Sequence, residues 1–586
     1  SEIFINPSNP DTVVVTGDAG VWITADGGAS WSNVYTDAAY DVKANPDNPN
    51  KLFMIADDGS DDDHDLFIST DGGFNWTVQT LGWYSSSDPA KACYGGRIAV
   101  SEADTSRVYA YLIGESKSGD IGYIGLWRSD DGGYNWTNPI GQVGGPYSST
   151  IPNLARGSDT WAYHQGFYNC AIMANNANAD EIVIGGLNMW RSNDGGVTFD
   201  CVHGYQCWNY DMHVDMQDFR AFGSQYWATT DGGIYFSTDF FNTQPSVVMN
   251  GIHGSEFWGF GSGWNEDLLV GGLYHNGNNA YYQNYSAGDF VHLGGGEAPT
   301  GYVNPGVERK AYFSDVGGKI VPANIGDPIV NASFGTAPNE SYWAAESSEL
   351  EFHPNCYNIM YLGKDNQIMK SVDGGALFTT VYTGASGATI TYIEISRQDP
   401  NKQYAIIKLS GACALLKTTD GWASASYKSM PTPANNALIT LNPSNDEQLW
   451  MALPNGSNGN KVYRSSNGGT SWANITSAIL DGESIHSLVT IGGTDGGVYA
   501  GTNVSVYYTN NTMGFWAADD AGLPAKINTN ILRPFYKDGK IRMASYGSGI
   551  WESPLYETPA APIATIMVNE LQALCAADTF YFDCYS

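Results

Sequence analysis

The sequence has few basic side chains: 27 Lys and Arg stand against 61 Asp and Glu, and the formal net charge of the 586 residues is -34. A field of that sign repels phosphate backbones and anionic headgroups, which disfavours nucleic acid and membrane surfaces as partners. No apolar run approaches the roughly 20 residues that a membrane-spanning helix needs. We therefore expect a protein that does not span the membrane.

Cysteine is also scarce, with eight residues in the whole chain. Cys201 and Cys207 lie close together in a polar loop, and we expect them to form a small disulfide. A zinc site is the weaker alternative because no second cysteine pair follows nearby. A disulfide would fit an oxidising exterior.

Glycine and aromatic residues are abundant, with 69 glycines and 13% Phe, Trp and Tyr. That composition is typical of short strands joined by tight turns. A motif recurs along the chain: Ser or Thr, any residue, Asp, Gly, Gly, and an aromatic residue three positions later, as in residues 24–31 and 69–76. Self-similarity of this kind indicates a repeat architecture.

Each motif lies between two strand-like stretches, which predicts a β-hairpin. The glycines supply positive φ, and the aspartate side chain accepts hydrogen bonds from amides of the turn. We assign this structural role at Asp26, Asp71, Asp131, Asp194, Asp373 and Asn467.

A second turn signature precedes many motifs, as in Asn6-Pro7-Ser8-Asn9-Pro10, and 45 residues separate Asp26 from Asp71. One repeat then holds about four strands, which is the size of a propeller blade. We predict an all-β, multi-bladed β-propeller.

The repeated motif resembles the Asp-box, or bacterial neuraminidase repeat, of sialidases, sortilin-type receptors and two-propeller xyloglucanases. The whole chain also resembles large secreted Bacteroidetes repeat proteins, several of which are type IX secretion cargo. This resemblance implies a secreted or cell-surface bacterial protein whose partners include the secretion translocon and cell-surface components.

About twelve repeats can be counted, seven of them before residue 335. We predict two tandem seven-bladed propellers, at 1–335 and 336–556; the alternative is one ten-bladed, sortilin-like ring. A Pro-rich linker follows at 557–565. Residues 566–586 resemble the start of a polycystic-kidney-disease-type, immunoglobulin-like domain.

The segment 210–218 is the sharpest candidate site, because Asp211, His213 and Asp215 alternate and would share one face of a strand, with Asp218 in the following turn. Such a set could bind a divalent metal or perform acid–base chemistry. The structural alternative, which we favour, is a buried polar cluster that holds neighbouring blades.

The acidic loop with Asp57, Asp61 and Asp63 is a second candidate, for Ca²⁺. It lacks the distal bidentate Glu of a twelve-residue calcium loop, so a solvated acidic hairpin is favoured. A third candidate is the aromatic pair Trp258 and Trp264, as a platform for sugar rings; packing within the blades is the favoured alternative.

Enzymatic activity has two weak candidates. A sialidase needs three arginines to hold the carboxylate of its substrate. The first of them stands in an Arg-Ile-Pro context, whereas this chain has Arg97-Ile98-Ala99, so sialidase activity is disfavoured. Asp18 and Asp315 loosely echo the catalytic segments of two-propeller xyloglucanases. We therefore favour a non-enzymatic binding protein that takes a glycan or surface protein. It requires no cofactor, and Ca²⁺ or another divalent metal is an optional ligand. A two-propeller glycoside hydrolase is the alternative.

Overall fold

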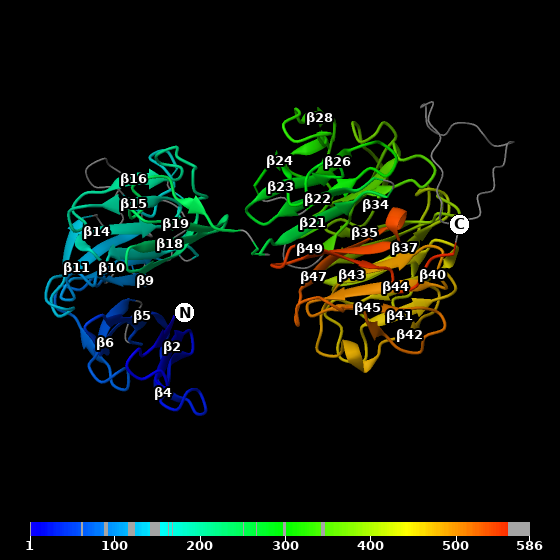
Figure 1. The fold of residues 1–586 in the computed structure, drawn as a ribbon. Coiled ribbons are helices and arrows are strands. Elements are labelled where there is room, and N and C mark those ends of the chain that lie inside the picture. Colours follow the sequence, from blue (N-terminus) through cyan, green and yellow to red (C-terminus); the bar gives the residue numbers. More distant parts are fainter. Residues whose placement is uncertain are drawn as a thin grey trace. The chain divides into compact units, whose positions relative to one another are not determined.

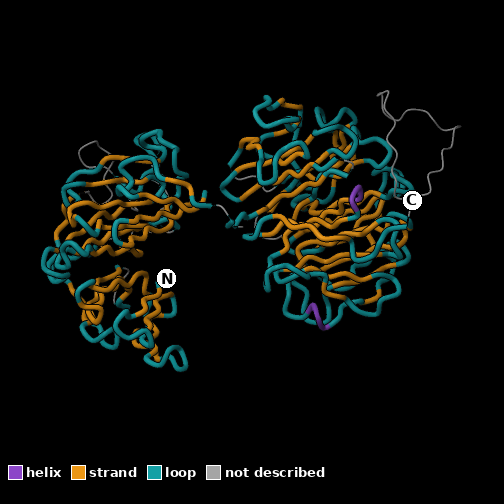
Figure 2. Tube along the Cα trace, viewed as in Figure 1, coloured by secondary structure: helices purple, strands orange, loops and turns teal. Residues whose placement is uncertain are grey.

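The computed structural model describes the chain except residues 1, 60–62, 87–91, 115–122, 141–152, 162, 167, 250, 253, 265, 297–299, 342–345 and 561–586. The described part is built from strands, with two short 3-10 helices, η2 (Ala478–Leu480) and η3 (Tyr536–Asp538) (Figures 1 and 2). No helix in it has the length and apolar character of a membrane span. The chain divides into two compact units, Ser1–Gly251 and Ile252–Ser586.

The first unit contains five four-stranded antiparallel sheets within its described residues. Sequence neighbours pair within each sheet, so every sheet is a meander of three hairpins. The strands are β1 (Ile3–Ile5), β2 (Val13–Gly17), β3 (Gly20–Thr24) and β4 (Ser32–Tyr35); β5 (Ala39–Asn45), β6 (Asn48–Asp57), β7 (His64–Ser69) and β8 (Thr77–Gln79); β9 (Cys93–Val100), β10 (Val108–Gly114), β11 (Tyr123–Ser129) and β12 (Thr137–Ile140); β13 (Ala171–Asn175), β14 (Asn178–Gly185), β15 (Met189–Ser192) and β16 (Asp200–His203); β17 (Met216–Phe222), β18 (Gln225–Thr230), β19 (Gly233–Ser237) and β20 (Ser246–Val247).

The second unit contains six sheets of the same kind, a three-stranded sheet at the end, and the small pair β29 (Glu340–Ser341) and β30 (Glu346–Ser347). The strands are β21 (Phe257–Ser262), β22 (Leu268–Leu273), β23 (Gly277–Tyr282) and β24 (Val291–Gly294); β25 (Tyr302–Val303), β26 (Lys310–Phe313), β27 (Gly317–Ile320) and β28 (Val330–Ala332); β31 (Glu351–Phe352), β32 (Met360–Lys364), β33 (Gln367–Ser371) and β34 (Thr379–Thr383); β35 (Thr389–Ile395), β36 (Gln403–Leu409), β37 (Ala412–Thr418) and β38 (Ser426–Lys428); β39 (Leu438–Asn442), β40 (Asn445–Ala452), β41 (Val462–Ser465) and β42 (Ala473–Asn474); β43 (Ile485–Ile491), β44 (Gly497–Thr502), β45 (Val506–Thr509) and β46 (Ala517–Ala518); β47 (Thr529–Phe535), β48 (Lys540–Ser545) and β49 (Ile550–Pro554).

The core of each unit lies between consecutive sheets. In the first unit, Val14 packs with Leu52 of the next sheet, and Phe53 packs with Ile98 of the one after. Second and third strands carry runs of buried residues, whereas fourth strands such as β42 are exposed. Burial on both faces of a sheet requires a neighbour on each side, which a ring of blades provides.

The ring of the second unit is closed. First strands of consecutive sheets contact one another from β31 to β47, β21 contacts β25, and β47 contacts β21. Between the second and third sheets, Tyr302 of β25 packs in one core cluster with Met360 of β32. At the closure, Phe257 and Phe260 of the first sheet pack against Ala544 of the last. The second unit is therefore a seven-bladed propeller.

The prediction of an all-β, multi-bladed propeller is confirmed. The boundary between the units follows Gly251, so the predicted boundary at residue 335 falls inside the second unit, after β28. The predicted single ten-bladed ring is not observed, because the sheets separate into two units. A repeat motif continues across a domain boundary without interruption, and therefore does not mark it.

The predicted linker 557–565 is described only to residue 560, and the predicted immunoglobulin-like start at 566–586 lies outside the described residues. The linker begins anchored to the last four-stranded sheet: the Glu557 carboxylate accepts hydrogen bonds from Tyr508 Oη at 2.7 Å and Asn510 Nδ2 at 2.8 Å.

Candidate functional site

The aspartates of the repeated motif hold their own turns. Asp26 Oδ1 accepts from Thr24 Oγ1 at 2.7 Å and from the Ser30 amide at 2.9 Å. Hydrogen bonds, above all from the Ser30 side chain, lower the pKa of Asp26 to about 2. The same pattern recurs at Asp71, Asp131, Asp194, Asp373 and Asn467, and also at Asp239 and Asp420.

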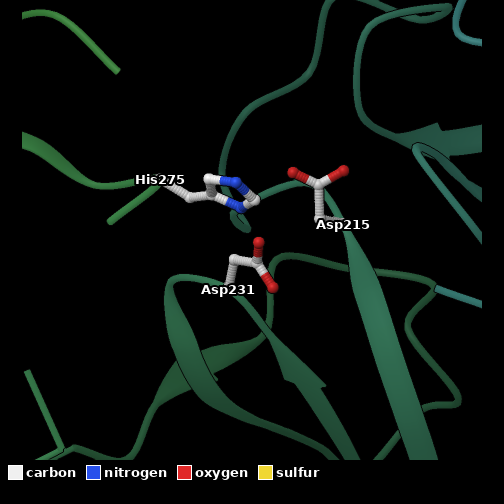
Figure 3. Close-up of side chains that lie close together, drawn as sticks. All are labelled: Asp215, Asp231 and His275. Atoms are coloured by element: carbon white, nitrogen blue, oxygen red, sulfur yellow. The ribbon is translucent and has the colours of Figure 1, made fainter. Parts of the chain in front are cut away.

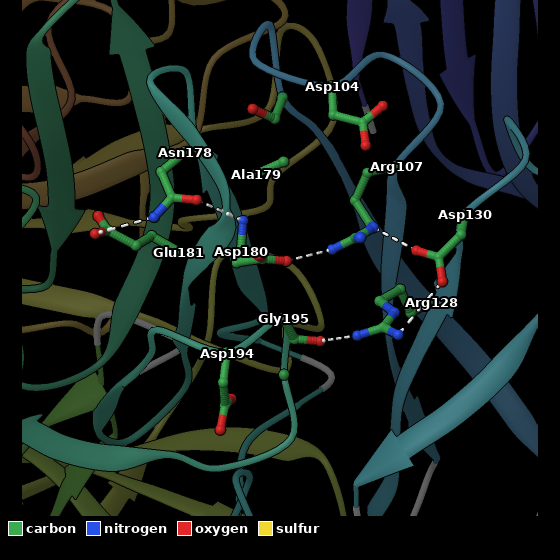
Figure 4. Close-up of polar contacts among 12 residues, drawn as sticks. Asp104, Arg107, Arg128, Asp130, Asn178, Ala179, Asp180, Glu181, Asp194 and Gly195 are labelled. Atoms are coloured by element: carbon green, nitrogen blue, oxygen red, sulfur yellow. Dashed lines mark hydrogen bonds and ion pairs between the residues drawn. The ribbon is translucent and has the colours of Figure 1, made fainter.

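Arginines beside these turns join neighbouring sheets (Figure 4). Arg107 pairs with Asp130 of its own sheet and, at 2.7 Å, with Asp180 of the next sheet. Arg128 donates to the carbonyl oxygen of Gly195 at 2.9 Å. These charged side chains have structural partners, so they are poor candidates for catalysis.

The strand predicted to carry Asp211, His213 and Asp215 is not formed, and Asp218 lies in a strand instead of a turn. Residues 211–215 are bends and irregular backbone, and β17 begins only at Met216. Asp215 has φ +66°, which breaks the extended alternation that would place Asp211, His213 and Asp215 on one face. Asp211 is exposed, and Asp218 forms an ion pair with Arg220 at 2.7 Å.

Asp215 instead lies beside a residue that the sequence reasoning missed, Asp231 in the turn between β18 and β19 (Figure 3). A carboxylate oxygen of Asp215 lies within 4.8 Å of one of Asp231. Asn169 Nδ2 donates to Asp215 at 3.1 Å, and Gln217 Nε2 donates to Asp231 at 2.7 Å. Two carboxylates at this spacing can face one ligand.

The surroundings of the pair retain capacity for a ligand. Asp215 is buried, whereas Asp231 is half-buried. Asn169 is also buried, and its Oδ1 has no hydrogen-bond partner within the described residues. A buried polar atom of this kind calls for a partner from outside the protein. The His213 ring packs directly over Gly232, the residue after Asp231.

Exposed aromatic rings lie among the described residues of the two loops that flank the pair, 153–170 (without residues 162 and 167) and 204–215. A hydrogen bond from the Asp159 amide to Gln206 Oε1 joins the two loops. Tyr168 Oη lies 3.4 Å from Asp231 Oδ1. Trp161 stacks on Tyr163 with centroids 5.4 Å apart. The rings that remain exposed are Trp161, Tyr168, Tyr210 and Trp208, the last of these 81% exposed.

Among the described residues of the acidic loop, Asp57 and Asp63 accept hydrogen bonds from backbone amides. Both oxygens of the buried Asp63 accept backbone amide hydrogens, from Ser86 and, at 2.6 Å, from Cys93. Asp57 accepts from the Gly59 amide at 2.8 Å. Asp61 lies outside the described residues. The carboxylates of Asp57 and Asp63 therefore stabilise the backbone of this loop and its neighbours.

The two tryptophans of the predicted platform are half-buried in the second unit. Trp258 stacks on Tyr274 with centroids 5.2 Å apart. The Arg397 guanidinium lies 4.4 Å from the Trp264 ring, which lines an internal cavity.

The predicted catalytic aspartates lie in hairpin turns, Asp18 between β2 and β3 and Asp315 between β26 and β27. Both are exposed, and Asp315 accepts from Asn278 Nδ2 at 2.8 Å. Asp18 belongs to the first unit and Asp315 to the second.

The predicted disulfide between Cys201 and Cys207 is wrong: both are free thiols, and their side chains hydrogen-bond to each other. Closeness in sequence brought the two sulfurs together but does not decide whether they are oxidised. Cys356, by contrast, is disulfide-bonded.

No protein-family model matches the chain, and no curated protein matches it in sequence. Among solved structures, an ancestral GH74 enzyme is similar over 96% of this chain and 92% of its own, with a TM-score of 0.57 and 13% identity. The Niastella koreensis GH74 enzyme covers 94% of this chain and 83% of its own (TM-score 0.42, 14% identity).

The GH74 xyloglucanase of Xanthomonas campestris covers 94% of this chain and 98% of its own, with a TM-score of 0.31 and 12% identity. At these identities the likeness concerns the fold alone. The chain has the β-propeller architecture, and its chemistry has to be argued from its own residues.

Proposed function

We propose that this chain binds carbohydrate at the first unit, on the site formed by loops 153–170 and 204–215 and the Asp215–Asp231 pair. The observation that carries the proposal is the exposed Tyr168 ring, whose hydroxyl lies 3.4 Å from Asp231 in a pair of close carboxylates. The apolar faces of sugar rings stack on Trp and Tyr, while sugar hydroxyls donate to carboxylates. Trp208 and Tyr168 supply the rings.

A neutral glycan is the substrate class that this site favours. The net charge of -34 and the two carboxylates oppose acidic sugars. A secreted or cell-surface location, with export by a type IX system, is part of the same proposal. The disulfide at Cys356 supports it, because disulfides persist in oxidising compartments.

Replacing Trp208 with Ala tests the binding function. A glycan array first identifies a neutral ligand of the full chain, and calorimetry then measures its affinity. We expect W208A to weaken binding about tenfold or more, since a stacked aromatic contact contributes on the order of 1–2 kcal/mol.

The matched control is Tyr427→Ala, an exposed aromatic residue of the second unit, which should bind as the parent does. Equal loss in both variants, or no neutral ligand on the array, would exclude this site.

A second candidate function is glycoside hydrolysis by the same pair. Its support is the closeness of the two carboxylates, since retaining glycosidases place their acid and nucleophile about 5–5.5 Å apart. The fold shared with a GH74 enzyme is compatible with it. Asp215, which is the more buried, would act as the acid, and Asp231 as the nucleophile.

Reducing-end release from xyloglucan and mixed-linkage β-glucan tests hydrolysis. Asp231→Asn should lower the turnover number by a factor on the order of 10² or more, while D18N and D315N should leave it unchanged. If D18N and D315N lost activity while D231N retained it, the catalytic carboxylates would be Asp18 and Asp315, the pair expected from the sequence, and not Asp215 and Asp231.

A further inference from the structure

The axis of the second unit contains a cavity of about 190 Å³. All seven sheets line it with residues of their first strands, β21, β25, β31, β35, β39, β43 and β47. Such strands need only small or apolar side chains to pack. This cavity instead holds three glutamates and two arginines: Glu349, Glu351, Glu394, Arg397 and Arg533.

Two of the acidic groups have polar partners. Arg533 Nη2 lies 3.1 Å from Glu349 Oε1, and Glu394 hydrogen-bonds to the Thr440 side chain. Glu349 also has φ +48°, a left-handed conformation that is costly for a residue with a Cβ. The backbone is strained where it delivers this carboxylate to the cavity.

Glu351 differs from both. Its carboxylate has no hydrogen-bond or ion-pair partner among the described residues, and its remaining exposure is to the cavity that it lines. Burial, and then the negative charge of Glu349, raises its pKa to about 8. Burial and Glu351 raise the pKa of Glu394 well above its usual value.

The cavity wall is aromatic as well as charged. Trp264, Tyr392 and Tyr536 line it, and Trp264 already carries the Arg397 guanidinium on its face. Burial raises the pKa of Tyr392 well above 10, so its hydroxyl stays neutral. Aromatic faces attract cations, most strongly where water is excluded.

We propose that this cavity binds a small organic monocation with N–H donors, of the primary-ammonium class, with Glu351 as its counter-ion. Three carboxylates and two guanidiniums line the cavity, so the acidic groups lack one basic counterpart, which would carry a single positive charge. A single ammonium supplies that charge and donates to Glu351, while its carbon chain contacts the aromatic wall. An anion would meet the three carboxylates, and a dication would exceed the one charge available.

Binding of this cation is coupled to a proton. The ligand binds the ionised form of Glu351, so below pH about 8 Glu351 must first lose its proton. The acidic and basic groups that line the cavity with it are Glu349, Glu394, Arg397 and Arg533. Affinity therefore rises with pH as Glu351 ionises, around pH 8. Below that value it falls by about tenfold for each pH unit, the factor for displacing one proton.

The experiment is calorimetry on the full chain with n-butylammonium chloride at pH 6 and pH 8.5. We expect affinity at pH 8.5 to be about a hundredfold higher, with one proton released to the buffer at pH 6. Glu351→Gln should abolish binding, and E394Q should weaken it. Glu308→Gln, at an exposed glutamate of the same unit, should bind as the parent does, and circular dichroism confirms that each variant is folded.

Two further solutes complete the test. Tetramethylammonium, which has no N–H donor, and n-butanol, which has no charge, should bind at least tenfold more weakly. The proposal is overturned if n-butylammonium does not bind the folded parent, if E351Q binds it equally well, or if n-butanol binds as tightly.

Discussion

Asp71 and Asp215 are both aspartates beside β-strands, yet their hydrogen bonds set them apart. Asp71 accepts from the Ser69 hydroxyl and from the amide of Asn75, within its own turn. Asp215 accepts from Asn169, 46 residues away, and faces Asp231. A carboxylate satisfied by its own turn is explained by folding, whereas a pair of close carboxylates has a cost that function can explain.

The acid sensitivity of the repeated turns can be predicted from Asp26. Its pKa in the folded chain is about 2, lowered from 3.8, so its ionised form stabilises the fold above pH 4. That contribution is lost as the pH falls from about 4 to 2, because protonation then favours the unfolded chain. The directions for Asp71 and Asp373 are the same. The melting temperature should therefore drop across this window.

Asp26→Asn provides the matched control, because Asn467 already occupies the equivalent position and donates to Ser471 Oγ at 2.8 Å. Ser30 can accept in the same way, so D26N should fold. The difference in melting temperature between parent and D26N should shrink as the pH falls from 5 to 2. A constant difference would show that Asp26 does not titrate with folding.

At the scale of the element, the hairpins were predictable and the loops were not. The strand before Asp26 and the turn around Gly72 follow from local turn chemistry, which acts within about eight residues. The segment before β17 misled the sequence reasoning, because the alternation from Asp211 to Asp215 is broken by one positive φ. Asp231 was missed because its turn resembles every other Asp-Gly turn in the chain.

Gly73 shows what the second glycine of the turn contributes. It has φ +101°, and a Cβ added there would lie 2.9 Å from Val14 Cγ2 of the neighbouring sheet. We expect Gly73→Ala to destabilise the first unit by about 2 kcal/mol or more, from the backbone conformation and the steric overlap together. Denaturant unfolding monitored by tryptophan fluorescence measures the change.

Gly411 separates those two contributions. It has φ +79° in the hairpin between β36 and β37, with no atom within 4 Å of an added Cβ. G411A should cost only the backbone contribution, about 1 kcal/mol. Equal effects of G73A and G411A would mean that contact with the neighbouring sheet has no part in fixing the turn.

At the scale of the whole chain, the closure of the ring in the second unit depends on residues far apart in sequence. Arg542 of β48 is buried and donates to Ser262 Oγ at 3.1 Å, 280 residues away. It also pairs with Asp267 at 2.5 Å and with Glu552 at 3.2 Å. No local pattern could predict this residue, since its partners come from both ends of the unit.

Arg542→Met should therefore weaken the closure of the ring. Methionine retains most of the packing volume but leaves the half-buried Asp267 without the guanidinium and Glu552 with Lys540 alone, which costs about 1–3 kcal/mol. Hydrogen exchange should accelerate first in β21 and β47, the two strands that meet there. Lys526→Met, at an exposed lysine of the same unit, should leave exchange unchanged. If R542M exchanged evenly over all seven sheets, the ring would unfold as one cooperative body, with no weak point at its closure.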